Sequence, residues 1–148
     1  MTVKDILQIG AQMELESYNF YIQSAEKSEY PGGKRLLTKL ASDEEKHRNY
    51  FLKALEDPAS IAPRIDNTTV TDLKLTDNLV DVPLDPKADF SQILKFAAQR
   101  EKVAHDFYLQ VAEQFKGTDL GNMLHNFALE ELRHKKLLED EYDEITGW

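Results

Sequence analysis

The sequence predicts an all-α four-helix bundle, built from two antiparallel helical hairpins that are joined by one long crossover. Four segments repeat apolar residues at steps of three and four, which is the spacing of one helix face. Short turns separate the first two segments and the last two, whereas a proline-rich stretch at about 56–87 separates the middle two. The second half of the chain also repeats the first, as expected for a duplicated hairpin.

The first hairpin begins with a helix predicted over about residues 2–28, for which Thr2 is the expected N-cap and Asp5 its partner three residues later. The stretch Tyr30-Pro31-Gly32-Gly33 contains strong helix breakers, so we expect a turn there. The second helix is therefore predicted over about residues 34–55.

The second hairpin begins with a helix predicted over about residues 90–115, where Asp89 and Gln92 have the spacing of a capping box. Lys116-Gly117-Thr118 forms the expected turn, and the fourth helix is predicted over about residues 119–145. The crossover at about 56–87 is long enough to return along the bundle before the third helix starts.

Length and composition narrow the class of protein. A chain of 148 residues predicts one domain, spanning residues 1–148. The net charge of −9 argues against nucleic acid or an anionic membrane as the main partner. Cysteine is absent, which excludes thiolate metal sites and a disulfide framework. The beginning of the chain does not resemble a signal peptide, and no stretch is apolar enough to span a membrane, so we expect a cytoplasmic protein.

An internal repeat relates the two predicted hairpins. When the first half is shifted by 87 residues, fourteen positions in a 42-residue window carry identical residues. The repeat includes one glutamate on the first helix of each hairpin and a Glu-x-x-His sequence on the second. The first set is Glu14, Glu44 and His47, and the second set is Glu101, Glu131 and His134.

These residues have the spacing of metal ligands. Residues three apart share one face of a helix, so each Glu-x-x-His offers an oxygen and a nitrogen to one place. At a rise of about 1.5 Å per residue, each upstream glutamate lies at the same height as the Glu-x-x-His of its hairpin. Approximate two-fold symmetry would then gather four carboxylates and two imidazoles at the centre of the bundle.

The charge of this cluster predicts the metal. The glutamates interrupt rows of Leu, Ala, Tyr and Phe that contain no Lys or Arg. Buried carboxylates without a counter-charge are costly, and two divalent cations would cancel four negative charges. Oxygen-rich ligands with one imidazole per metal suit iron or manganese. The alternative is a structural bundle without metal.

The motifs resemble a known family. The stretches MELESYNFY and REKVAHDFY, together with SDEEKH and LEELRH, resemble the rubrerythrin-like branch of the ferritin-like superfamily. That resemblance implies a ferritin-like four-helix bundle and a non-haem di-iron centre that reacts with hydrogen peroxide or dioxygen. It implies two iron ions per chain, with manganese as an alternative. Glu44 and Glu131 would be the bridging carboxylates, and Glu14, His47, Glu101 and His134 the other ligands.

The chain departs from that family at identifiable positions. Full rubrerythrins carry a rubredoxin domain with four cysteines, and this sequence has none, so we expect an external donor such as a rubredoxin-like protein or a reductase. Rubrerythrins place an extra Glu where this chain has Ala104, which brings the set closer to a bacterioferritin-type centre. The haem-ligating Met of bacterioferritin corresponds to Glu45, so no haem is expected.

The competing functions follow from the same resemblance. The leading interpretation is a di-iron peroxidase or oxidase, the second is a ferroxidase that feeds iron into storage, and the third is a metal-binding bundle without turnover. We expect a homodimer or a larger homo-oligomer, because the crossover and the exposed helix faces offer surface for one.

Several neighbours of the predicted ligands have weaker assignments. Tyr21 and Tyr108 lie two turns from Glu14 and Glu101, so each either hydrogen-bonds a ligand carboxylate or is an ordinary core tyrosine. His105 is expected to be a hydrogen-bonded core residue rather than an alternative ligand. Glu16, Glu45 and Glu130 flank ligands in the sequence, and we expect them to be solvated.

Overall fold

Four long α-helices form the described part of the chain, which covers residues 2–62 and 85–147 of the computed structural model. They are α1 (Val3–Lys27), α2 (Pro31–Glu56), α3 (Phe90–Gln114) and α4 (Asp119–Ile145), and a short 3-10 helix, η1 (Pro58–Ser60), follows α2. Within these residues there is no strand. The predicted all-α fold class is confirmed.

Side-chain caps account for where three of the helices begin, and two of these caps were predicted. At the start of α1 the Asp5 backbone N–H donates to Thr2 Oγ1 at 3.2 Å, while the Thr2 N–H donates to Asp5 Oδ2 at 2.9 Å. Asp89 and Gln92 form the same reciprocal pair at the start of α3, with both distances 2.9 Å. Thr118 caps α4, and Gly117 before it has a φ of +87°, a conformation that favours glycine.

The predicted start of the second helix is wrong by three residues. The helix begins at Pro31, because proline has its φ already set for a helix and needs no hydrogen bond at the first position. Gly33 is buried inside the first turn, and a Cβ there would lie 2.4 Å from the Phe90 ring. Glycine at this position therefore allows the two hairpins to pack closely, and it does not form a turn.

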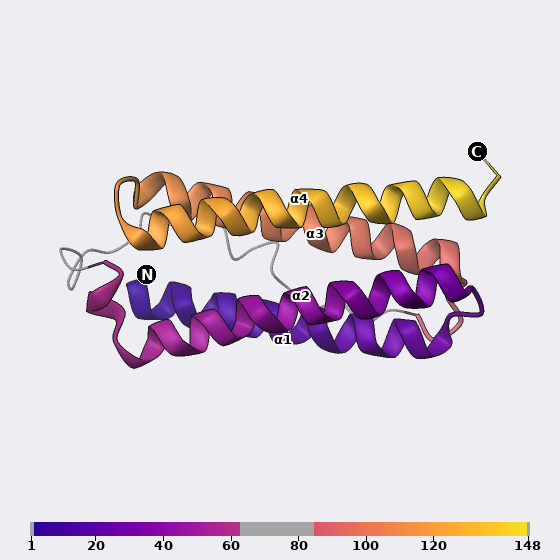
Figure 1. Cartoon of the computed structure of the whole chain (residues 1–148), viewed down its shortest axis with the longest axis horizontal. Coiled ribbons are helices and arrows are strands. Elements are labelled where there is room, and N and C mark those ends of the chain that lie inside the picture. Colours follow the sequence, from indigo (N-terminus) through magenta and orange to yellow (C-terminus); the bar gives the residue numbers. More distant parts are fainter. Residues whose placement is uncertain (1, 63–84, 148) are drawn as a thin grey trace.

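The helices pack as two hairpins, α1 with α2 and α3 with α4. In Figure 1 the hairpin of α3 and α4 lies along that of α1 and α2, with all four helices parallel to the long axis of the molecule. This arrangement is that of a four-helix bundle. Most of the predicted crossover, residues 63–84, lies outside the described residues. In the described part of the chain, no helix is both long enough and apolar enough to cross a membrane.

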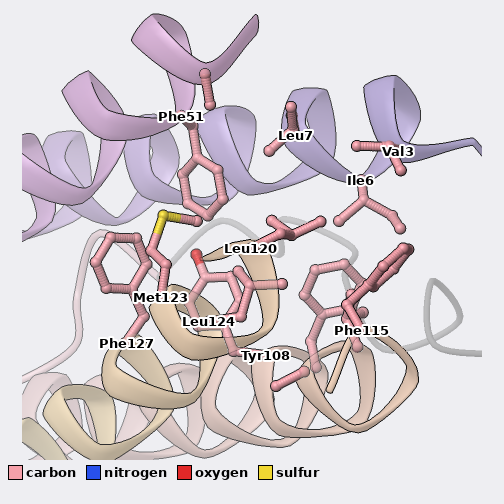
Figure 2. Packing of buried hydrophobic residues seen from close by; sticks show 14 of the residues in the cluster. Val3, Ile6, Leu7, Phe51, Tyr108, Phe115, Leu120, Met123, Leu124 and Phe127 are labelled. Atoms are coloured by element: carbon pink, nitrogen blue, oxygen red, sulfur yellow. The ribbon is translucent and has the colours of Figure 1, made fainter. Parts of the chain in front are cut away.

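Two apolar clusters fill the two ends of the bundle. Figure 2 shows the larger one, in which Phe51 of α2 reaches toward Tyr108 and Phe127 of the other hairpin. The ring centroid of Phe51 lies 5.8 Å from that of Tyr108 and 5.6 Å from that of Phe127. The smaller cluster is built around residues such as Tyr21 and Leu138. Between the two clusters lies a layer of buried glutamate and histidine.

Candidate metal centre

The structure brings all six predicted ligands together in the buried layer. Each of these six residues is at most 4% exposed. Their ligand atoms form two groups, and within each group these atoms lie within 4.8 Å of one another. The first group is Glu14, Glu44, His47 and Glu131, and the second is Glu44, Glu101, Glu131 and His134.

Glu44 and Glu131 belong to both groups. The two residues come from α2 and α4, which are the equivalent helices of the two hairpins. Each group also contains one glutamate and one histidine of its own. Two overlapping groups that share two carboxylates have the arrangement needed to hold a pair of metal ions.

Unpartnered polar atoms show that the residues fit bound metal. In the described structure, Oε2 of Glu14, Glu44 and Glu101 has no hydrogen-bond partner, although each atom is buried. Oε1 of Glu131 and Nδ1 of His47 are also without one. Buried polar atoms normally have a hydrogen-bond partner. The unpartnered atoms here are carboxylate oxygen and imidazole nitrogen, which are the ligand atoms that iron and manganese bind.

The carboxylates repel one another in the absence of metal. Burial raises the pKa of Glu44 to about 8, and the charge of Glu14 adds to this rise. Burial and the field of Glu44 raise the pKa of Glu101 above its usual value. Burial and the charge of Glu101 raise the pKa of Glu131 well above its usual value. The cluster is therefore set to take up positive charge, as protons or as metal ions.

The two histidines supply part of that charge. Burial lowers the pKa of His47, but the adjacent carboxylate of Glu14 more than offsets this effect, so that the pKa rises to about 9. The pKa of His134 rises to about 11, because Glu101 and Glu44 outweigh the effect of burial. Both rings are thus cationic at neutral pH in the metal-free chain. The rows that contain the glutamates have no Lys or Arg, and the histidines provide the positive charge instead.

Each histidine presents one ring nitrogen to the carboxylate cluster and the other to a carboxylate outside it. His47 Nδ1 lies 3.2 Å from Glu131 Oε1 and 3.4 Å from Glu14 Oε1, while its Nε2 lies 2.5 Å from Glu130 Oε2. His134 Nδ1 lies 2.9 Å from Glu44 Oε1, while its Nε2 donates to Asp43 Oδ2 at 3.0 Å. A carboxylate that accepts from Nε2 fixes the proton there and leaves Nδ1 free to bind a metal.

These outer carboxylates were not predicted from the sequence. The Glu130 side chain is 45% exposed, in agreement with the expectation that it is solvated, and it also contacts His47. Asp43 was not singled out. A signal was present, because Asp43 and Glu130 correspond under the 87-residue shift and each precedes a ligand glutamate. The repeat was identified from identical residues, and Asp43 and Glu130 are both acidic but not identical.

The tyrosines hydrogen-bond the predicted ligands across the bundle. Tyr21 of α1 donates its hydroxyl to Glu101 Oε1 of α3, and Tyr108 of α3 donates to Glu14 Oε1 of α1 at 2.5 Å. Burial and the neighbouring carboxylates raise the pKa of both tyrosines well above the usual value, so both remain neutral donors. Each tyrosine occupies one oxygen of its glutamate and leaves the other oxygen unpartnered.

Two further predictions concern α3. His105 lies outside both candidate groups, and its Nδ1 is 3.0 Å from Asp106 Oδ1. It is partly buried and hydrogen-bonded, in agreement with the expectation. Ala104 is buried on the inner side of α3 and has no atom that could bind a metal.

The comparison with protein families concerns the first hairpin. Residues 1–55 match the family model called Rubrerythrin. The predicted resemblance to rubrerythrin is confirmed over this part of the chain, which contains Glu14, Glu44 and His47. The second set, Glu101, Glu131 and His134, lies outside the matched residues and is related to the first by the internal repeat.

The remaining comparisons concern the fold. No curated protein matches the chain. A solved structure of a hypothetical protein from Pyrococcus furiosus is similar to it with a TM-score of 0.73 and 22% sequence identity, covering 100% of this chain and 92% of that chain. At this identity the similarity shows a shared fold over the full length. A rubrerythrin-like motif set on this fold, with two overlapping Glu and His groups, supports a metal-binding ferritin-like protein.

Proposed function

We propose that this protein is a non-haem di-iron oxidoreductase that reduces hydrogen peroxide or dioxygen with electrons from an external donor. The observation that carries the proposal is the pair of overlapping buried groups that share Glu44 and Glu131. Iron, when bound, supplies the redox change between Fe(II) and Fe(III). The choice of iron over manganese rests on the rubrerythrin match.

The residues divide into three roles. Glu44 and Glu131 would be the shared ligands, because both belong to both groups, whereas Glu14 and Glu101 each belong to one. Tyr108 and Tyr21 hold one oxygen of these two glutamates, which orients the other oxygen toward the cluster. The hydrogen bonds from the tyrosine hydroxyls therefore restrict how each carboxylate can rotate.

The histidines set the protonation of the site. Asp43 and Glu130 accept from the outer ring nitrogen, so the proton that leaves when a metal binds is the one on Nδ1. The pKa of Asp43 is held below its usual value, because hydrogen bonds from Lys39 and His134 outweigh its partial burial. Asp43 is thus ionised and suited to accept a hydrogen bond from the histidine.

Burial protects the chemistry from solvent. The two apolar clusters close the site at both ends, and the ring of Phe127 stacks on that of His47 with the centroids 4.0 Å apart. A site closed in this way admits a small oxidant more readily than a bulky substrate. This agrees with peroxide or dioxygen as the reactant.

A ferroxidase is the second candidate, and Ala104 is the observation that favours it. Rubrerythrins carry an extra glutamate at this position, and here the residue is a buried alanine. The ligand set then has six members, as in a bacterioferritin-type centre. Under this proposal iron is the substrate and is passed on after oxidation.

Anaerobic titration with Fe(II), followed by stopped-flow oxidation, tests the proposal. We expect saturation near two irons per chain and faster oxidation by hydrogen peroxide than by dioxygen. Faster reaction with dioxygen and continued iron uptake would support the ferroxidase instead. The double variant Glu44→Ala and Glu131→Ala should lose tight binding, whereas Glu45→Ala with Glu113→Ala, both at exposed positions, should keep it. Equal binding by the two double variants would refute the site.

A further inference from the structure

One exposed side of α2 carries a row of cationic side chains that we term the α2 cationic face. Its members are Lys34, Arg35, Lys39 and Lys46, which line one shallow hollow together with Asp43. They recur at helical spacing, so they project from the same side of α2. In Figure 1 this helix lies in front of α1, on the side of the bundle where α4 is its neighbour.

The charge of this face is opposite to that of the chain as a whole, which has a net charge of −9. Within the described residues, Lys34 and Lys46 form no ion pair. Lys39 Nζ lies 2.8 Å from Asp43 Oδ2. Burial and the charge of Glu144 raise the pKa of Glu141, and the nearby Arg35 opposes part of this rise. At least two full positive charges are therefore available to a partner. A concentrated patch of this sign attracts acidic molecules and steers their approach.

The cationic face is connected to the metal centre through one residue. Asp43 lines the hollow, and its Oδ2 accepts a hydrogen bond from His134 Nε2 at 3.0 Å. The Asp43 side chain is 26% exposed, whereas that of His134 is 5% exposed. Molecules bound in the hollow are thus separated from a candidate metal ligand by a single side chain. Electron transfer slows steeply with distance, so such a short connection suits a docking site for a redox partner.

We propose that the α2 cationic face docks a small acidic protein that carries one electron at a time. The inference rests on the proposed function for its redox role, but the docking itself is a separate property of the surface. Two carriers, each oxidised by one electron, balance the reduction of one hydrogen peroxide and two protons to two waters. Attraction between the acidic carrier and the cationic face accelerates their encounter and weakens with added salt.

The first test measures docking without electron transfer. The probe is a rubredoxin, which is small and acidic, loaded with zinc in place of iron so that it has no redox activity. Binding is followed by titration calorimetry at low ionic strength. The triple variant Lys34→Gln, Arg35→Gln and Lys46→Gln should bind about tenfold more weakly and with a reduced dependence on salt. Lys39 is left unchanged, because it holds Asp43.

The matched control removes the same charge elsewhere. Lys95, Lys102 and Lys116 are exposed residues on α3 and in the turn that follows it, and none lines the α2 hollow. The triple variant with glutamine at these positions has the same net charge as the α2 variant. It should bind the zinc rubredoxin as the unchanged protein does.

The second test measures electron delivery to the iron-loaded protein. Reduced iron rubredoxin should reduce the α2 variant about tenfold more slowly than the unchanged protein at low salt, whereas dithionite should reduce both at the same rate. The zinc titration reports docking whether or not the chain holds iron, so a failure of the di-iron proposal and a failure of docking give different results.

Several outcomes would overturn the docking proposal. The first is no binding of zinc rubredoxin, and the second is an equal loss of binding in both triple variants, which would show an effect of net charge alone. The third is stronger binding of a DNA duplex than of the acidic protein. The fourth is a cross-link from Lys34 to residues 63–84 of the same chain, which would show that the face is covered by the chain itself.

Discussion

Replacing Glu44 with glutamine should make the metal-free protein more stable while it damages metal binding. Glu44 is fully buried and belongs to both candidate metal groups. Glutamine has nearly the same shape and keeps an oxygen that can accept the hydrogen bond from His134, but it carries no charge. The substitution therefore isolates the electrostatic cost that this carboxylate imposes on the folded chain.

The magnitude follows from the shift in pKa. Folding raises the pKa of Glu44 from 4.5 to about 8, so at pH 7 the folded state holds a proton that the unfolded state has lost. At pH 7 the carboxyl group of the unfolded chain is about 2.5 pH units above its pKa, whereas that of the folded chain is still protonated. Each pH unit corresponds to about 1.4 kcal/mol, so the cost of this group to folding at pH 7 is about 3 kcal/mol. The stability contributed by this proton is fully present below pH 4.5 and is lost as the pH rises toward 8. Glu44→Gln should therefore gain nothing at pH 4.5 and about 3 kcal/mol at pH 7.

Urea unfolding of the metal-free protein at several pH values measures this gain. A gain of about 3 kcal/mol corresponds to a rise in Tm of about 6–12 °C for a domain of this size. Glu45→Gln is the control, because Glu45 is the exposed neighbour and its change should be within about 0.5 kcal/mol. Added Mn(II) should raise the Tm of the unchanged protein far more than that of Glu44→Gln. A Glu44→Gln variant that is less stable at pH 7, or whose gain does not change with pH, would refute the reasoning.

Three further predictions concern the outer carboxylate, a tyrosine and a buried glycine. Asp43→Asn should weaken Fe(II) binding about 10–100-fold in anaerobic titrations, because it weakens the acceptor that fixes the ring of a metal-binding histidine, while Glu45→Gln should not. Tyr108→Phe should cost about 1–3 kcal/mol in urea unfolding, because a buried carboxylate oxygen loses its donor; an unchanged stability would contradict this. Gly10→Ala should lower the free energy of unfolding by about 1–3 kcal/mol, because its Cβ would lie 2.5 Å from an aromatic ring. Gly32→Ala is the control and should be tolerated, because its Cβ meets no atom closer than 3.9 Å. Equal thermal stability of the two variants would count against the packing argument.

Most of the fold was predictable because helix periodicity and caps are local properties of the sequence. Thr2, Asp89 and Thr118 lie where the structure starts its helices. The start of α2 was not predicted correctly, because Pro31-Gly32-Gly33 is compatible with both a turn and a first helical turn. The choice depends on Phe90, a residue of the other hairpin that packs against Gly33.

The candidate ligands were predictable for a related reason. Spacing along one helix determines which residues share a face and a height, and the repeat supplied the second half of the set. Spacing does not determine which helix lies opposite. Tyr21 was therefore predicted to lie near a ligand glutamate, but its hydrogen-bond partner, Glu101 of the other hairpin, was not predictable from spacing. Asp43 and Glu130 were missed for the same reason, because each contacts a histidine of the opposite half.

The contacts of these outer residues all pass from one hairpin to the other. Tyr21 bonds Glu101, Tyr108 bonds Glu14, and the two histidines each bond an acidic residue of the opposite repeat. In a dimer of two identical hairpins, one mutation would alter both metal positions at once. A duplicated hairpin within one chain removes that restriction, so natural selection can adjust the two positions separately. The aspartate at 43 and the glutamate at 130 are already such a difference.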